Sequence, residues 1–132
     1  MKSAIYTAMT SATTVAVDGT LPLGTVIRRF GCNCQLSGNG ISITGAGYYD
    51  TNISVTLLPT AVGNVTVTLS KDGVAIQGAT ATTNVTAANT PVTLSFPALI
   101  RLQCCETTSN LTYVLTGTES SVTNVGVVVE KI

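Results

Sequence analysis

The sequence predicts an all-β fold, either a sandwich or a barrel-like jelly roll, and three observations support this prediction. Apolar and polar residues alternate along most of the chain, as in NVTVTLSKDGVAIQGA at 64–79, which is the period of half-buried strands. Turn signals separate such runs at intervals of about 8 to 12 residues. No segment of ten or more residues has a helical period, because Val, Ile and Thr dominate. Short, evenly spaced strands are typical of sandwiches and jelly rolls.

Each predicted strand is an alternating or β-branched run that ends at turn residues. The predicted turns lie at Asp18-Gly19, Gly38-Asn39-Gly40, Pro59, Asp72-Gly73, Asn89-Thr90-Pro91 and Thr116-Gly117-Thr118. The predicted strands cover residues 4–7, 14–17, 25–29, 32–36, 41–44, 47–58, 64–70, 74–77, 80–86, 91–96, 100–105, 111–116 and 125–130.

The Asp-Gly pair at 72–73 predicts a β-hairpin in detail. Asp-Gly supplies the two positive-φ positions of a type I′ turn, whose twist matches the strands that it joins. Lys71 should therefore face Val74, and Leu69 should face Ile76. This register places apolar residues opposite apolar residues.

Length and charge limit the classes of function. The chain is predicted to form one domain over residues 1–132, with a single core. Charged residues make up 9% of it, and six basic residues balance six acidic ones, whereas an average soluble domain is about 25% charged. Nucleic-acid binding needs clustered Lys or Arg, and Arg28-Arg29 is the sole adjacent basic pair in the sequence. Nucleic acid is therefore not a predicted partner.

The closing segment, SVTNVGVVVEKI at 121–132, is apolar on both of its faces. Val125, Val127 and Val129 share one face of an extended strand, and Val128 lies on the other. An antiparallel strand with one wet face normally alternates, so this pattern indicates burial on both sides. Because the rest of the surface is weakly charged, we predict that Val125, Val127 and Val129 are buried in a subunit interface.

Tyr48 and Tyr49 are adjacent, so they face opposite sides of one strand. One ring can pack in the core while the other contacts a neighbouring subunit or a ligand. Tyrosine is enriched at protein contacts, so both residues are assigned to the predicted subunit interface.

Four cysteines are the positions where redox or metal chemistry could occur. Cys32 and Cys34 would point the same way from a strand, whereas Cys104 and Cys105 are adjacent and would point opposite ways. A bond within either motif is disfavoured by disulfide geometry, and a zinc site would require Cys104 and Cys105 to converge. Free thiols packed as small hydrophobic groups are favoured; a disulfide between the motifs and a metal or redox site stay open as alternatives.

The sequence offers no catalytic constellation, and we predict that the protein is not an enzyme. It contains no His, which removes the commonest general base and the commonest zinc ligand. Its six acidic residues are dispersed and form no recognisable carboxylate motif. No catalytic, cofactor-binding or metal-binding residue is predicted, and no cofactor is expected.

No exported or membrane-spanning segment is expected. Ser and Thr interrupt every apolar run after Met1-Lys2, so the chain has no continuous apolar region of a signal peptide. No run approaches the roughly 20 residues that span a bilayer. We therefore expect synthesis in a reducing cytoplasm and no membrane partner.

The sequence also resembles two groups of known proteins. The order GAGYYDTNISVTLLP, VTVTLSKDGVAI, TPVTLSFPALIRLQ, LTYVLTG and VGVVVEKI resembles the trimeric jelly-roll domains of the tumour-necrosis-factor (TNF) and complement globular-head type. In that superfamily a Gly-x-Tyr start of a long strand, a hairpin with an Asn/Asp-Gly turn and an apolar closing strand follow one another. Over nearly all 132 residues, the chain is similar to small head fibre or capsid decoration proteins encoded among the structural genes of tailed bacteriophages.

The resemblance implies an antiparallel TNF-like jelly roll, a homotrimer, and a structural role on the exterior of a phage capsid after synthesis in the host bacterial cytoplasm. The expected partners are the phage major capsid protein, reached through residues 1–24 as an N-terminal attachment segment, and host-surface or mucus glycans. Two alternatives are a bacterial surface or spore-coat trimerisation head and a carbohydrate-binding module.

Overall fold

The computed structural model describes residues 2–9, 11–103 and 108–132, which form eleven strands and no helix. None of these residues belongs to a helix that could cross a membrane. The strands are β1 (Ser3–Ala8), β2 (Thr13–Val15), β3 (Thr25–Phe30), β4 (Cys34–Ser37), β5 (Gly40–Thr44), β6 (Gly47–Pro59), β7 (Gly63–Lys71), β8 (Val74–Val85), β9 (Val92–Leu102), β10 (Thr108–Thr116) and β11 (Ser120–Lys131).

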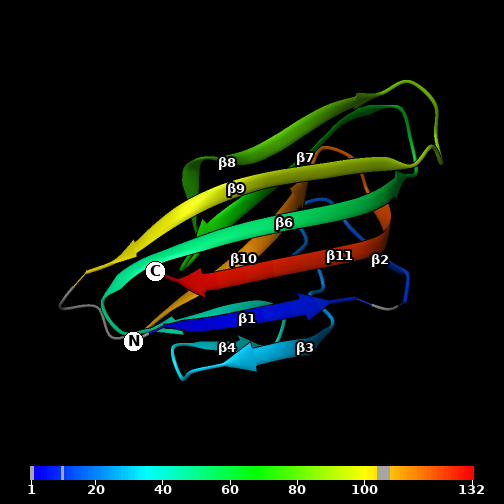
Figure 1. Cartoon of the computed structure of the whole chain (residues 1–132). Helices are drawn as coiled ribbons and strands as arrows, with labels where there is room; N and C mark the ends of the chain where they lie inside the picture. Colours follow the sequence, from blue (N-terminus) through cyan, green and yellow to red (C-terminus); the bar gives the residue numbers. More distant parts are fainter. Residues whose placement is uncertain (1, 10, 104–107) are drawn as a thin grey trace.

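The strands form two antiparallel sheets that pack face to face (Figure 1). Sheet A has the order β3-β1-β11-β6-β9, and the short β2 pairs with the first residues of β11. Sheet B has the order β4-β5-β10-β7-β8. Consecutive strands repeatedly lie in different sheets, as in a jelly roll. The predicted fold class, an antiparallel β-sandwich jelly roll, is confirmed.

One hydrophobic core lies between the sheets, because each long strand turns its apolar alternate residues inward. On β6, for example, Ile53, Val55 and Leu57 are buried, while the residues between them are partly or fully exposed. The largest fully buried side chains come from both sheets and from the segment after β2. They are Tyr49, Tyr113, Ile5, Leu21, Leu23, Ile41, Ile43, Ile53, Leu57, Leu69, Leu102 and Leu111.

The N-terminal segment makes backbone hydrogen bonds to both sheets. β1 lies between β3 and β11 in sheet A. Leu21 and Leu23 are fully buried, and the Leu21 N–H donates to the Tyr113 carbonyl of β10 at 2.7 Å. The attachment role of residues 1–24 stays a prediction, and only the outward side chains of this segment are available for it.

The Asp-Gly hairpin has the predicted turn, with φ of 53° and 85° at residues 72–73. The predicted pairing of Lys71 with Val74 is present. At Leu69 the register shifts, so its predicted pairing with Ile76 is wrong. β8 has a bulge there, which places extra residues opposite one residue of β7.

Two predicted breaks do not interrupt their strands. The runs at 74–77 and 80–86 merge into β8, and those at 91–96 and 100–105 merge into β9 up to residue 102. Pro97 sits inside β9, where it pairs with Asn52. Proline is tolerated there because β9 borders sheet A and one of its sides makes no ladder hydrogen bonds.

Candidate functional site

The outward faces of the two sheets differ in chemistry. The outer face of sheet B carries hydroxyl and amide side chains that hydrogen-bond one another across strands. The Thr66 and Thr82 hydroxyls are 2.9 Å apart, those of Thr68 and Thr80 are 3.0 Å apart, and an amide pair on the same strands lies 2.8 Å apart. This neutral polar face of β7 and β8 suits contact with water.

The outer face of sheet A also has a cross-strand hydroxyl pair, Thr56 and Thr93 at 3.2 Å, but it carries exposed aromatic and aliphatic side chains as well. Its central row crosses four strands, because the register places Tyr6 of β1 beside Val128 of β11, Val128 beside Asn52 of β6, and Asn52 beside Pro97 of β9. Tyr6 and Val128 are exposed although both are largely apolar, and 37% of Val128 is accessible to solvent. We call this set of four residues the Tyr6 row.

More exposed apolar groups flank the Tyr6 row near the border of sheet A. Leu99 of β9 is 60% exposed. Tyr48 of β6 is also exposed, and the Arg101 guanidinium of β9 lies over its ring, 5.8 Å from the centroid. Tyr48 points outward because of its place in the alternation of β6, and a cation over an aromatic face is favourable.

A shallow hollow lies beside the Tyr6 row. Gly126 of β11 pairs with Ser54 of β6, and Ser54 pairs with Ser95 of β9, so three small residues stand side by side. The resulting hollow has a volume of about 320 Å³, and its rim includes Tyr6 and Val128. A protruding side chain of another molecule could enter this hollow.

Two carboxylates interrupt the apolar character of this face. Glu130 of β11 pairs directly with Asp50 of β6, and like charges in that arrangement repel each other. No group of three or more Cys, Asp or Glu residues among the described residues could hold a metal ion.

The structure corrects the predicted position of three interface residues. Val125, Val127 and Val129 are fully buried in the core of a single chain. A side chain without exposed surface cannot add area to a contact between subunits. The reason is that sheet B already covers this face of β11, so the other face, with Val128, is the one left for a partner.

The two adjacent tyrosines divide between core and surface. Tyr49 is fully buried, and its hydroxyl donates to the carbonyls of Thr44 at 2.8 Å and Gly45 at 2.7 Å. Burial raises its pKa. Tyr49 is thus excluded from the interface to which it was assigned. Tyr48 is exposed, and its contact with a partner stays a prediction.

The described cysteines are free, with Cys32 exposed and Cys34 buried. Burial raises the pKa of the Cys34 thiol to about 11, although the nearby cations Arg29 and Lys131 oppose this shift. Such a thiol is a poor nucleophile at neutral pH. The predicted strand at 32–36 begins two residues later than expected, at Cys34. Cys104 and Cys105 lie outside the described residues.

The sequence analysis missed Tyr6, Pro97 and Leu99. The available signal was the alternation of the strands: Tyr6, Pro97 and Leu99 each lie at positions that alternate with the buried residues of their own strand and so point outward. An exposed apolar residue is common on any protein, so alternation alone could not separate a contact face from ordinary surface.

No protein-family model and no curated protein matches the sequence. Several solved structures match the fold. The Eiger TNF from S. frugiperda has a TM-score of 0.69 and 12% identity over 100% of this chain and 92% of that chain. Murine APRIL has a TM-score of 0.70 and 11% identity over the whole of both chains. The PRD1 vertex protein P5 has a TM-score of 0.65 and 13% identity over 98% of this chain and 96% of that chain.

At these identities the likeness shows the fold. The chain has a TNF-like jelly roll, as the sequence resemblance implies, and this fold occurs both in cytokines and in a protein of a viral vertex.

Proposed function

We propose that this protein is a non-enzymatic structural protein of a bacteriophage virion, a homotrimer that decorates the capsid or forms a head fibre. Two findings support this proposal. The sequence resembles phage head fibre and decoration proteins along nearly its whole length, and its fold is that of the vertex protein P5 of phage PRD1.

The proposed trimer rests on the exposed apolar surface of the outer face of sheet A. Tyr6 and Val128 expose apolar surface at a hollow of about 320 Å³, and Leu99 is exposed on the same face. In sheet B, by contrast, the outer face of β7 and β8 carries threonine pairs that hydrogen-bond each other. Three protomers bury the sheet A face around a threefold axis. An obligate assembly of this kind buries about 2,000 Å² or more.

The assembled trimer binds by shape and by repetition. It lies on the capsid exterior against the major capsid protein, and its loops are turned toward the host surface or toward mucus glycans. Three equivalent contacts convert weak binding into avidity. The protein is made in the cytoplasm of the host bacterium and needs no cofactor for this role.

Sedimentation equilibrium at micromolar concentration tests the assembly. The natural chain should sediment as a trimer, and Val128→Glu should sediment as a folded monomer, because the change places a charge in the buried face. Thr82→Glu, on the exposed outer face of sheet B, is the matched control and should remain trimeric. A monodisperse monomer for the natural chain, or a trimer for Val128→Glu, would overturn this assignment.

Co-sedimentation with empty capsids tests the role in the virion. The capsids are assembled from the major capsid protein encoded beside this gene. The natural trimer should pellet with them at a saturating, symmetric ratio. If the trimer stays in the supernatant at all concentrations, or if the neighbouring genes encode a stalk or a cell-wall anchor, the bacterial trimerisation head becomes the better assignment.

A carbohydrate-binding module is the remaining alternative, and Tyr48 is the observation that favours it. Its ring is exposed, and aromatic faces stack on sugars. A glycan array with saturable hits that Tyr48→Ala abolishes would support this function. Tyr49→Ala is uninformative as a site variant, because Tyr49 lies in the core.

A further inference from the structure

β3 is exposed along its whole length on both faces. All six of its residues are exposed, whereas every other strand contains at least one buried or partly buried residue. Ile27 is 48% exposed and Phe30 is 59% exposed, and Val26 is exposed as well. Apolar side chains on both faces of one strand are costly to leave in water. This pattern therefore needs an explanation beyond that of an ordinary surface strand.

β3 also presents a free backbone edge. It pairs with β1 on one side and with no described strand on the other, and it forms one border of sheet A (Figure 1). An open hollow of about 440 Å³ lies beside it, lined by residues 27–30 alone. A row of unpaired backbone N–H and C=O groups is a template for another strand.

Both ends of β3 are held in place. Gly24 and Gly31 each have a φ of 78°, and a β-carbon at either position would clash with the chain beside it, at Ala8 or at Ser3. Only glycine fits these two approaches. The Arg29 Nε–H donates to the Cys34 carbonyl at 2.6 Å, which joins β3 to the start of β4. The edge is thus fixed in an extended form before any partner arrives, which lowers the entropy cost of binding.

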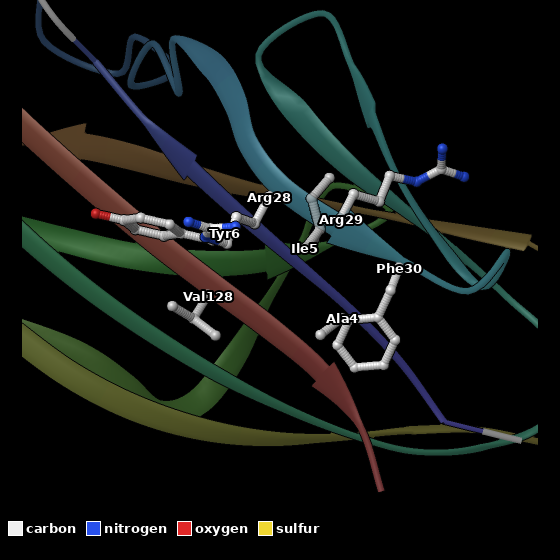
Figure 2. A pocket seen from close by; sticks show the side chains of 7 residues that line it. All are labelled: Ala4, Ile5, Tyr6, Arg28, Arg29, Phe30 and Val128. Atoms are coloured by element: carbon white, nitrogen blue, oxygen red, sulfur yellow. The ribbon is translucent and has the colours of Figure 1, made fainter.

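The edge is positively charged on both faces. Figure 2 shows Phe30 beside Ala4, and Arg29 pointing away from Tyr6, while the register pairs Arg28 with Tyr6. The side chains of Arg28 and Arg29 therefore lie on opposite faces. No acidic residue lies on β1, β3 or β4, so the charge of this edge is not neutralised within these strands.

The charge argues against pairing of β3 with a second copy of itself. An antiparallel pair centred near residues 27–29 would bring the guanidinium groups of the two copies opposite or diagonal to each other. Such neighbours are about 4.5 to 8 Å apart, and like charges there are destabilising. Arginines on an edge strand suppress self-association in this way, but they attract a strand of opposite charge.

We propose that the free edge of β3 is a docking site for an extended segment of another protein, which adds a strand to sheet A. The segment carries two adjacent acidic residues, one for Arg28 and one for Arg29, flanked by β-branched or aromatic residues. Main-chain hydrogen bonds supply affinity, and the acidic pair supplies specificity. The flanking apolar residues cover Ile27 and Phe30. This site goes beyond the proposed capsid role. It uses the free backbone edge of β3, whereas the trimer contact is assigned to the Tyr6 row, so the two proposals have separate readouts.

Fluorescence anisotropy with short labelled peptides tests the proposal on the full chain. The first probe is Thr-Val-Thr-Val-Glu-Glu-Val-Thr-Val-Thr, and the second has Lys-Lys in place of Glu-Glu. We expect saturable binding of the acidic peptide with a Kd of about 100 μM or tighter at low salt, and none for the Lys-Lys peptide up to about 1 mM. Raising the salt concentration should weaken binding.

Matched variants locate the site. Arg28→Gln together with Arg29→Gln should weaken the acidic peptide at least about tenfold, because both charge pairs are lost. Arg101→Gln, on β9 at the other border of sheet A, is the control and should change the Kd by less than about twofold. Circular dichroism should show all three proteins folded. Bound peptide should also slow amide hydrogen exchange in β3 and leave β8 unchanged.

Four outcomes would overturn the proposal: no saturation by the acidic peptide at about 1 mM, equal binding of the acidic and Lys-Lys peptides, equal weakening by Arg101→Gln, or tighter binding of a ten-nucleotide oligothymidylate, which would indicate a general anion site. None of these outcomes changes the sedimentation result, so failure of this site is distinguishable from failure of the trimer.

Discussion

Three tyrosines receive the same substitution, Tyr to Phe, and the structure predicts a different result for each. Tyr49→Phe removes a hydroxyl whose single proton is shared between the carbonyls of Thr44 at 2.8 Å and Gly45 at 2.7 Å. The Thr44 carbonyl keeps the Asn33 amide at 2.6 Å, but the Gly45 carbonyl loses this donor. A lost hydrogen bond and a partly buried carbonyl together cost about 1–2 kcal/mol.

Tyr113→Phe should have the opposite sign. Its hydroxyl is buried without a hydrogen-bond partner, and burial raises the pKa of this phenol to about 12. The Thr51 side chain lies near enough to oppose this shift in part, but it makes no hydrogen bond of good geometry with the phenol, and its hydroxyl donates to the Ala98 carbonyl. An unsatisfied buried polar group costs about 1–3 kcal/mol, and the Phe96 ring, with its centroid 5.8 Å away, packs equally well against a phenyl group. We expect a gain of up to about 1 kcal/mol.

Tyr48→Phe is the control, because its hydroxyl lies at the surface, and its effect should be within about 0.5 kcal/mol. Urea unfolding followed by circular dichroism, at one protein concentration, gives the three free energies. Thermal melts give an independent check, since 1 kcal/mol moves the Tm by about 4 °C for a chain of this size. Loss of more than about 1 kcal/mol in Tyr113→Phe would refute the reasoning, because that hydroxyl would then have a partner. A neutral Tyr49→Phe would refute the role given to its two hydrogen bonds.

Three further predictions follow from single features. Gly117→Ala should destabilise the chain by more than about 2 kcal/mol in urea unfolding, because Gly117 has a φ of 96° and a β-carbon there would overlap the Asn64 carbonyl; a loss below about 0.5 kcal/mol would contradict it. A backbone N–H of β10 bonded to the Asp72 carboxylate lowers the pKa of Asp72 below its ordinary 3.8. The hydrogen bond to the ionised Asp72 therefore stabilises the fold above pH 3.8, and this stabilisation is lost as the pH falls through the lower pKa of the folded protein. Between about pH 4 and pH 2, the natural chain should lose more free energy of unfolding than Asp72→Asn. An equal loss in the two proteins would argue against this bond. Iodoacetamide should label Cys32 in the folded protein and Cys34 only after unfolding, as mass spectrometry of peptides can show, because Cys34 is buried and the pKa of its thiol is about 11; equal labelling of both would contradict the described burial.

Most strands could be predicted because their signals are local. Alternation and β-branched residues define a strand, and an Asp-Gly pair defines a hairpin turn, from residues adjacent in the chain. The turn at 72–73 has the predicted positive φ at both positions. The break predicted near Gly78 was wrong. It is a bulge inside β8, because β7 pairs with β8 on both sides of it.

The candidate face could be predicted only in part. Alternation assigned Val127 and Val128 to opposite sides of β11 but did not say which side was inside, since both are apolar. Sheet B covers the Val127 side, and the Val128 side remains open. The same ambiguity applied to Tyr48 and Tyr49.

The sequence by itself determined the all-β class, the approximate positions of most strands, the Asp-Gly turn at 72–73, and the neutral, weakly charged composition, because these depend on residue type and on spacing of two. The tertiary structure decided which face of each strand is buried, how Tyr6, Val128, Asn52 and Pro97 come to lie in one row, and that β3 has a free edge. Strand pairing joins residues far apart in the chain, and a shift of one residue exchanges the inner and outer faces. No local pattern contains that information.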